Sequence, residues 1–187
     1  MRVIAGKFRS RLLKGPGKLR LRPTSDRLRE TLFNILGRAV EDSWFLDLYA
    51  GTGAIGIEAV SRGAREVIFV ESHPATAKLI RANLASLKIN AGVDVIEAPA
   101  LRGLERIGER RLIADFVFLD PPYERESELR EVLDYLDVSH IVAPRGLVVV
   151  EHRKSTELPE RLERLERTRL LEQGDAALSF YRLAAAA

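Results

Sequence analysis

The chain has 187 residues, of which 46% are hydrophobic and 30% are charged, a balance typical of one folded domain and not of a disordered segment. It contains no cysteine, which excludes disulfides, thiolate metal sites and a cysteine nucleophile and fits a reducing cytoplasm. No signal-peptide pattern and no apolar run of about 18 residues occurs, so we expect neither secretion nor a membrane span.

Positive charge is concentrated at the start of the chain. Residues 1–29 carry ten Lys or Arg and one acid, a net charge of +9, so the other 158 residues sum to −6 within a total of +3. A basic arm on an acidic body is typical of proteins that bind a phosphate backbone. The arm lacks apolar residues at helical spacing, which disfavours a membrane-surface helix and leaves a solvated tail as the alternative.

The expected elements follow one another in a regular order. Residues 1–13 are expected to form two short strands that turn near Gly6, and residues 14–24 a linker. A helix begins at Ser25 or Asp26. Strands and helices then alternate. The expected strands are 44–48, 66–70, 93–96, 115–119, 146–151, 167–173 and 177–183. The expected helices after the first are 54–62, 74–88, 100–110, 126–136 and 157–164.

This alternation predicts an α/β fold with a mostly parallel sheet and helices on both faces. The last two strands, joined around Gly174 and Asp175, predict an antiparallel hairpin. We expect two units, a basic arm over residues 1–24 and a cofactor-binding domain over residues 25–187.

A glycine-rich turn follows the first strand of the body. Gly51, Gly53 and Gly56 have the G-x-G-x-x-G spacing, which lets the chain turn tightly and lets a ligand approach the backbone. Glu71 lies 20 residues after Gly51 at the end of another apolar run, where a carboxylate can accept hydrogen bonds from both ribose hydroxyls. Strand, turn, helix and acid together predict a nucleoside cofactor. The alternative is an ordinary glycine-rich turn beside a solvated acid.

The charge near this turn distinguishes between cofactors. A dinucleotide presents a pyrophosphate to the helix N-terminus. S-adenosylmethionine has no phosphate, and its methionine end carries an ammonium and a sulfonium, which favour a nearby carboxylate. Asp47, four residues before Gly51, supplies one. We therefore expect S-adenosylmethionine rather than NAD.

A second motif ends the strand at 115–119. Asp120, Pro121, Pro122 and Tyr123 follow it directly, where ligands bind in open α/β sheets. The prolines remove two N–H donors, so the loop offers the Asp120 carboxylate and the Pro121 carbonyl as acceptors beside the flat Tyr123 ring. Acceptors beside a stacking face suit a nucleobase with an exocyclic amino group. A proline-terminated strand with an ordinary turn is the alternative.

These residues resemble the amino-directed class I methyltransferases, whose Asp/Asn-Pro-Pro-Tyr/Phe motif holds an exocyclic nitrogen. Along nearly its full length the chain resembles one family, the bacterial small-subunit (16S) ribosomal RNA guanine-N2 methyltransferases. The matching parts are residues 2–11, 21–34 and 47–58, Glu71, Asn83, residues 120–123 and residues 177–182.

The resemblance implies a Rossmann-like class I methyltransferase fold with a mostly parallel seven-stranded sheet, helices on both faces, a C-terminal antiparallel hairpin and a small basic N-terminal hairpin. It implies S-adenosylmethionine as the cofactor and small-subunit ribosomal RNA, free or in the 30S particle, as the partner. It further implies a cytoplasmic monomer with no metal site and no membrane contact. Methyl transfer to guanine N2 is the expected reaction.

Three groups of site residues are expected. The acceptor site comprises Asp120, Pro121, Pro122 and Tyr123. The cofactor site comprises Asp47, Tyr49, Gly51, Gly53, Glu71, Ser72, Glu97, Ala98 and Asp120. The RNA-binding residues are Arg2, Lys7, Phe8, Arg9, Arg11, Arg20, Arg22, Thr24, Arg27 and Arg29. The role of Arg22, Thr24 and Arg29 in bridging cofactor and RNA rests on the resemblance alone.

One departure from the family pattern concerns adenine. Related enzymes often place Asp or Asn where this chain has Ala98, so a backbone group or Glu97 is expected to bind the adenine amino group. Three other functions stay open: a DNA adenine-N6 or cytosine-N4 methyltransferase, an NAD-dependent reductase, and a non-catalytic RNA-binding module. The length leaves little room for the target-recognition domain that DNA methyltransferases usually add.

Overall fold

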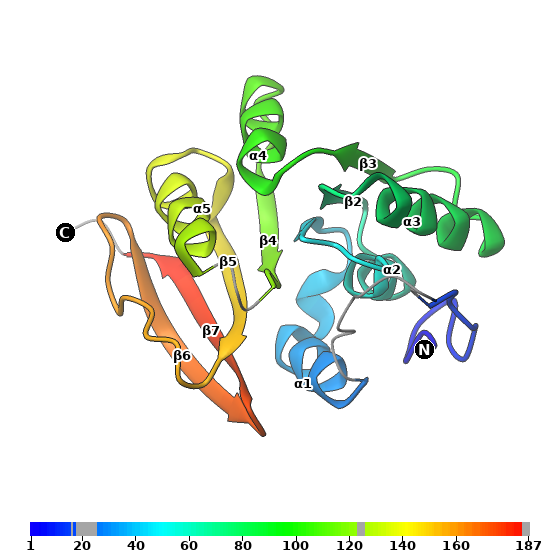
Figure 1. The fold of residues 1–187 in the computed structure, drawn as a ribbon, viewed down its shortest axis with the longest axis horizontal. Helices are drawn as coiled ribbons and strands as arrows, with labels where there is room; N and C mark the ends of the chain where they lie inside the picture. Colours follow the sequence, from blue (N-terminus) through cyan, green and yellow to red (C-terminus); the bar gives the residue numbers. More distant parts are fainter. Residues whose placement is uncertain (16, 18–25, 123–125, 185–187) are drawn as a thin grey trace.

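A seven-stranded sheet with the order β3-β2-β1-β4-β5-β7-β6 forms the centre of the molecule (Figure 1). The computed structural model describes residues 1–15, 17, 26–122 and 126–184. The strands are β1 (Trp44–Leu48), β2 (Glu66–Glu71), β3 (Val93–Glu97), β4 (Ala114–Leu119), β5 (Val142–Arg153), β6 (Leu165–Gln173) and β7 (Ala176–Leu183). The helices are α1 (Asp26–Leu36), the 3-10 turn η1 (Gly37–Val40), α2 (Ala54–Ser61), α3 (Pro74–Ser86), α4 (Ala100–Glu109) and α5 (Glu126–Val138).

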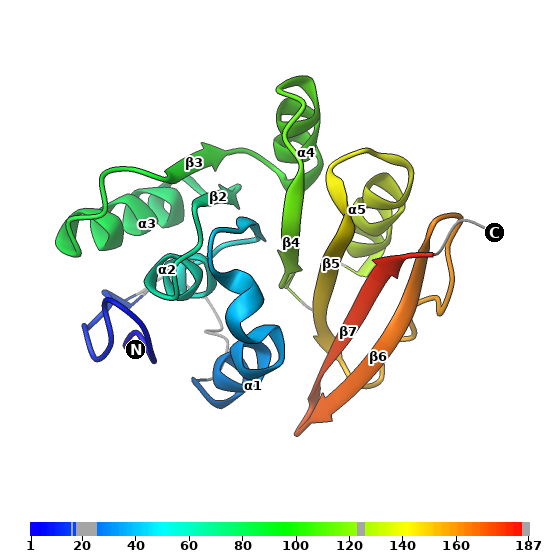
Figure 2. The same cartoon turned by 180° about the vertical axis from the view of Figure 1, so that it is seen from behind.

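The first five strands are parallel, and β7 pairs antiparallel with both β5 and β6. Figure 2 shows the β6–β7 hairpin at one edge of the sheet. The expected α/β fold with a C-terminal antiparallel hairpin is therefore confirmed. Within the described residues, no helix is long and apolar enough to cross a membrane.

Alternating side chains of the strands divide the core into two layers. In β1, Phe45 joins the cluster formed with α1, α2 and α3, whereas Leu46 joins the cluster formed with α4 and α5. This is the period-two pattern of a strand buried on both faces, which reads as a continuous apolar run. Helices therefore cover both faces, as the alternation of elements predicts.

The expected helix at 157–164 is wrong. The structure has no helix there, and the buried Asp137 carboxylate at the end of α5 accepts backbone N–H bonds from Glu163, Arg164 and Leu165 at 2.9, 2.8 and 2.6 Å. One carboxylate thereby satisfies three successive donors. Because these groups bond to Asp137, the charged pattern of the segment does not produce a helix.

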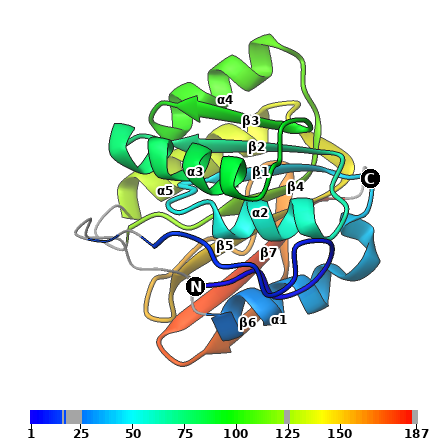
Figure 3. The ribbon, with the colours of Figure 1, turned by 90° about the vertical axis from the view of Figure 1, so that its right-hand side faces the viewer.

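The expected pair of strands at residues 1–13 is reduced to one isolated antiparallel bridge between Arg2 and Leu12. The segment packs on the body: Val3 and Leu13 are buried in the same cluster as α1 and α2. Figure 3 shows it running alongside α2. The expected boundary between residues 24 and 25 lies outside the described residues.

Candidate cofactor and acceptor site

Three carboxylates gather at the carboxyl ends of neighbouring parallel strands. Asp47 is the fourth residue of β1, Glu71 ends β2, and Asp120 directly follows β4. By strand alternation Asp47 shares the face of Phe45, Glu71 that of Phe69, and Asp120 that of Phe118, which is the face covered by α1–α3. The fold thus brings together three acids that the sequence places 24 and 49 residues apart.

The glycine-rich turn joins β1 to α2 with its backbone bonded to two of these acids. Gly51 N donates to Glu71 Oε2 at 2.9 Å, and Gly56 N donates to Asp47 Oδ2 at 2.8 Å. Gly53, with φ 77°, is the residue before α2 and adopts the left-handed conformation. At Gly56 a Cβ would lie 2.2 Å from Phe69 Cε1, so only glycine lets α2 pack this closely on β2.

Tyr49 lies in the same turn with a φ of 61°, which is unusual for a residue other than glycine. Its hydroxyl donates to Glu128 Oε1 in α5 at 3.1 Å. Tyr49 therefore connects the glycine-rich turn at residues 49–53, the candidate cofactor turn, to α5, the helix that follows the acceptor motif. Backbone strain of this kind persists where surrounding contacts fix it, and it is common at ligand sites.

Asp47 is fully enclosed. Burial raises the pKa of its carboxyl well above the ordinary value, the Gly56 N–H opposes this rise, and the nearby Asp120 and Glu71 carboxylates add to it. Repulsion among three acids disfavours a pyrophosphate here, whereas a ligand with an ammonium and a sulfonium would relieve it. The electrostatics of the turn therefore fit S-adenosylmethionine better than a dinucleotide.

Glu71 is buried and uses both carboxylate oxygens: Oε2 accepts Gly51 N, and Oε1 accepts His73 N at 2.8 Å. Each oxygen keeps a second lone pair that could accept a ribose hydroxyl. Next to it, Ser72 is exposed. Glu97 is exposed and pairs with Arg81 at 3.4 Å, whereas Ala98 is buried and its N–H bonds to the Glu71 carbonyl at 3.1 Å.

The acceptor motif borders a small, partly open hollow. Pro121 is buried, Pro122 is exposed, and Asp120 N donates to the Leu48 carbonyl at 3.5 Å, which ties the motif to the end of β1. The residues that line the hollow are Pro121, Pro122, Leu129, Glu151, His152, Arg153 and Thr156. Tyr123 lies outside the described residues.

Most of the expected RNA-binding residues that the structure describes are on the surface. Arg2, Lys7, Arg9, Arg11 and Arg27 are exposed. Phe8 is half-buried, with Lys7 Nζ 5.5 Å from its ring centre. Arg20, Arg22 and Thr24, which are also expected to contact RNA, lie outside the described residues.

Arg29 differs from its expected role in RNA contact, because its side chain is fully buried in α1. It donates to the Arg2 carbonyl at 2.7 Å and to Asp26 Oδ1 at 3.0 Å. Burial lowers the pKa of its guanidinium, while the Asp26 and Glu58 carboxylates oppose that shift. Arg29 therefore holds the arm against the body, a role that its position among exposed basic residues does not indicate.

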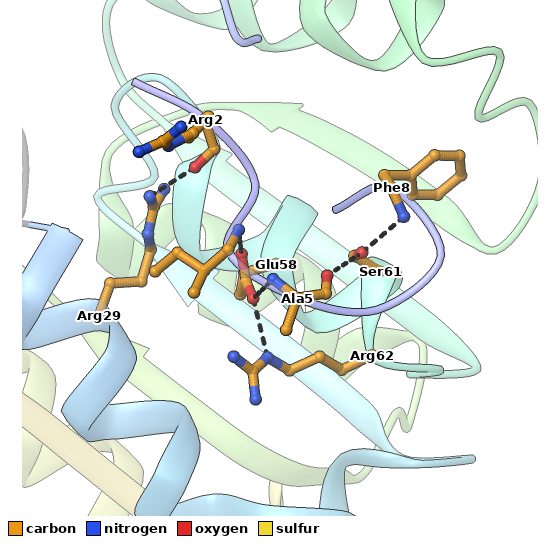
Figure 4. Close-up of polar contacts among 8 residues, drawn as sticks. Arg2, Ala5, Phe8, Arg29, Glu58, Ser61 and Arg62 are labelled. Carbon is orange, nitrogen blue, oxygen red and sulfur yellow. Dashed lines mark hydrogen bonds and ion pairs between the residues drawn. The ribbon is translucent and has the colours of Figure 1, made fainter. Parts of the chain in front are cut away.

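Two polar residues of α2 that the sequence reasoning missed also hold the arm (Figure 4). The buried Glu58 carboxylate accepts the N–H groups of Ile4 and Ala5 at 2.8 and 3.0 Å. Ser61 Oγ accepts Phe8 N at 2.9 Å and donates to the Ala5 carbonyl. Their signal was present in the sequence: they are the two polar side chains, three residues apart, of an otherwise apolar helix.

Close approach of the arm also requires a glycine. Gly6 has a φ of 78°, and a Cβ there would lie 1.9 Å from the Ser61 carbonyl oxygen. The Lys7 N–H donates to that same oxygen at 2.7 Å. The basic arm therefore packs directly against α2, the helix that begins at the cofactor turn.

The chain is similar in sequence to known proteins. The family model described as "Conserved hypothetical protein 95" matches residues 1–182. "Putative rRNA methyltransferase YlbH" of Bacillus subtilis (strain 168) is 35% identical over 97% of this chain and 98% of its own length. "Ribosomal RNA small subunit methyltransferase D" of Escherichia coli (strain K12) is 38% identical over 85% of this chain and 78% of its own length.

A solved structure is also similar. The Escherichia coli protein named "Putative methyltransferase yhhF" superposes with a TM-score of 0.87 and 33% identity, over 100% of this chain and 99% of that one. The fold is that of the class I methyltransferases. The chain belongs to the conserved hypothetical protein 95 family, the family of ribosomal RNA small subunit methyltransferase D.

Proposed function

We propose that this protein transfers a methyl group from S-adenosylmethionine to the exocyclic N2 of a guanine in small-subunit ribosomal RNA. Membership of the family supports methylation of ribosomal RNA by an S-adenosylmethionine-dependent enzyme. The observation that carries the proposal is that Asp120, the first residue of the acceptor motif, lies near Asp47 and Glu71, at the ends of β4, β1 and β2. An acceptor motif and an acidic cofactor turn thus share one edge of the sheet.

The residues of the turn suit each part of the cofactor. Asp47 would face the cationic methionine end, Gly51 and Gly53 would let the ligand approach the backbone, and Glu71 would accept the ribose hydroxyls. The buried Ala98 offers its backbone for the adenine amino group. S-adenosylmethionine, when bound, supplies an electrophilic methyl group on a sulfonium.

Asp120 and Pro121 would orient the nucleophile. The carboxylate and the carbonyl accept the two N–H bonds of the guanine amino group, which turns the nitrogen lone pair toward the methyl group and draws the nitrogen toward sp3 geometry. Tyr123 would stack on the base. The nitrogen would form its bond to the methyl carbon as the carbon–sulfur bond breaks and S-adenosylhomocysteine leaves. The alkylated nitrogen, now cationic, would then lose a proton to water, so no strong base is needed. Orientation and electrostatics supply most of the rate.

The arm would hold the RNA. Its exposed Arg2, Lys7, Arg9 and Arg11 give a positive surface on a body that is otherwise acidic. Because these residues are clamped to α2, they lie at a set position relative to the cofactor turn. A base must leave its stack to enter such a site, which favours a guanine in an exposed loop.

One labelling experiment tests the whole proposal. Labelled S-adenosylmethionine is offered to small subunits, and separately to naked 16S RNA, from a strain that lacks the modification, and the nucleosides are then separated. The expected product is N2-methylguanosine, formed about 10²-fold or more slowly in a parallel reaction in which Asp120→Ala replaces the parent. Label in adenosine, in cytidine or in added duplex DNA would contradict the proposal.

A further inference from the structure

A buried amide connects the basic arm to the cofactor turn. Asn83 lies in α3 and has no exposed surface. Its Nδ2 donates to the Thr52 carbonyl at 3.0 Å and to the Lys14 carbonyl at 3.2 Å, and its Oδ1 accepts Lys14 N at 2.8 Å. The amide thus uses both of its donors and its acceptor, one on the turn and two on the arm.

Thr52 is the point where these contacts meet the cofactor turn. It is buried between Gly51 and Gly53, so its carbonyl cannot bond to water instead. The other end of the arm reaches the same residue: the Thr52 hydroxyl lies 3.8 Å from Met1 Sδ. Met1 and Lys14 are themselves joined through Leu13, whose N–H donates to the Met1 carbonyl at 3.1 Å.

We infer that Asn83 is a positioning residue for two binding sites at once: it sets the conformation of the cofactor turn and the place of the arm. The cofactor half follows from the bond to Thr52. The RNA half rests on the proposed function of the arm. Asn83 touches neither reacting group, since it acts through Thr52 and Lys14 only.

The physical reason is the cost of leaving buried backbone groups unpaired. Without the amide, the buried Thr52 carbonyl loses its partner, and the backbone N–H and C=O of the exposed Lys14 lose the bonds that tie them to α3. The turn and the arm would shift to recover water or other partners. Asn83→Asp is the sharpest change, because it keeps the shape and turns the donor into an oxygen that faces two carbonyls.

Ser61 provides a matched control. It makes the same pair of contacts to the arm, accepting Phe8 N and donating to the Ala5 carbonyl, but it bonds to no residue of the cofactor turn among the described residues. Ser61→Ala should therefore weaken RNA binding while S-adenosylmethionine binding stays within a factor of about two. Asn83→Asp should weaken both.

The experiment measures S-adenosylmethionine binding by calorimetry without RNA, RNA binding by titration without cofactor, and steady-state kinetics for the parent, Asn83→Asp, Asn83→Ala and Ser61→Ala. We expect Asn83→Asp to weaken S-adenosylmethionine binding by about tenfold, equal to about 1.4 kcal/mol, and to raise the KM values for both cofactor and RNA. The kcat at saturation should stay within a few-fold of the parent value. Should the aspartate variant fail to fold, Asn83→Ala carries the same comparison without the added repulsion.

Three results would overturn the inference. Cofactor affinity equal to that of the parent would show that the bond to Thr52 does not position the turn. An equal loss of cofactor affinity in Ser61→Ala would indicate general loosening of the fold. A fall in kcat with unchanged KM values would indicate a smaller active fraction. If the parent itself does not bind RNA, the proposed function fails, yet the cofactor titration still decides the role of Asn83.

Discussion

The Asp47 carboxylate is expected to lower the stability of the ligand-free protein and to favour binding of a cationic ligand. Its carboxyl has a raised pKa chiefly because it is buried, with Asp120 and Glu71 adding repulsion. The folded protein therefore binds this proton more tightly than the unfolded chain does. Its contribution to stability is present below the ordinary carboxyl pKa and is lost as pH rises through the raised value. A cationic ligand would offset that loss at neutral pH.

Asp47→Asn should therefore separate the two effects. At neutral pH we expect the ligand-free variant to unfold at a higher denaturant concentration than the parent. S-adenosylmethionine should bind about tenfold or more weakly, the range for losing a charged hydrogen-bond partner. Chemical denaturation and calorimetry measure these two quantities. A variant that binds the cofactor as the parent does would remove Asp47 from the site.

The pH dependence of binding provides an independent check. In the parent, cofactor affinity should fall as pH drops through the raised pKa of Asp47, because the carboxyl must lose its proton to meet a cation. In Asp47→Asn this dependence should be flatter. Calorimetry in buffers of different ionisation enthalpy counts the protons released on binding. Equal proton release in parent and variant would point to another group.

In the proposed mechanism Asp120 acts on the amino group of the base. Asp120→Ala should lower turnover by about 10²-fold or more, because the proposed charged acceptor for the amino group is lost, while cofactor affinity changes little. Single-turnover kinetics at saturating RNA measures the rate of methyl transfer, and calorimetry measures the cofactor affinity. Turnover within a few-fold of the parent would exclude Asp120 as the ligand of the amino group.

At the scale of elements, the arm and α2 behave as one unit. Glu58 and Ser61 bond to the arm backbone, and Gly6 lets the two approach closely. A side chain at residue 6 would meet the Ser61 carbonyl and adopt a positive φ as well. These three residues, none of which carries a positive charge, therefore help to order the arm alongside Arg29 and Asn83.

Gly6→Ala should displace the arm without removing a charge. We expect RNA affinity to fall by about tenfold or more, with cofactor affinity less affected, because clash and backbone strain together cost on the order of 1–3 kcal/mol. Ser10, which also has a positive φ but lies at an exposed position, offers a control as Ser10→Gly. Equal RNA affinity in Gly6→Ala and the parent would show that the docked position of the arm is not needed.

At the scale of the whole molecule, charge and packing are separable in the arm. Deleting residues 1–13 would remove Val3 and Leu13 from the core as well as four basic side chains, so such a deletion should lower the melting temperature. Substitution tests the electrostatics more cleanly. The residues to change to Gln are the exposed Arg2, Lys7, Arg9 and Arg11.

The substituted protein should keep the melting temperature of the parent and lose RNA affinity. The slope of the logarithm of affinity against the logarithm of salt concentration should flatten by about 0.7 for each single-strand phosphate contact removed. S-adenosylmethionine affinity should stay unchanged. Titrations over a salt series measure the slope, and an unchanged slope would show that the basic residues are merely solvated.

The order of the elements and the location of the candidate site could be predicted from the sequence, because their signals are local. The order of strands and helices follows from apolar runs and from the glycine, proline and polar residues that end them. The turn at Gly51 and Gly53 and the motif at Asp120 each lie within a few residues of a strand end, and the parallel sheet brings those ends to one edge. Short-range spacing was enough to select the fold class and the candidate site.

Only the tertiary structure decided how the arm is held and which charges are available. Glu58 meets Ile4 across 54 positions, and Asn83 meets Lys14 across 69. Asp137 replaces an expected helix by bonding to backbone 26 to 28 residues away. Arg29 has the charge of an RNA contact, yet it is buried. Such outcomes depend on which buried donors and acceptors find each other once the chain is compact, and local sequence patterns do not contain that information.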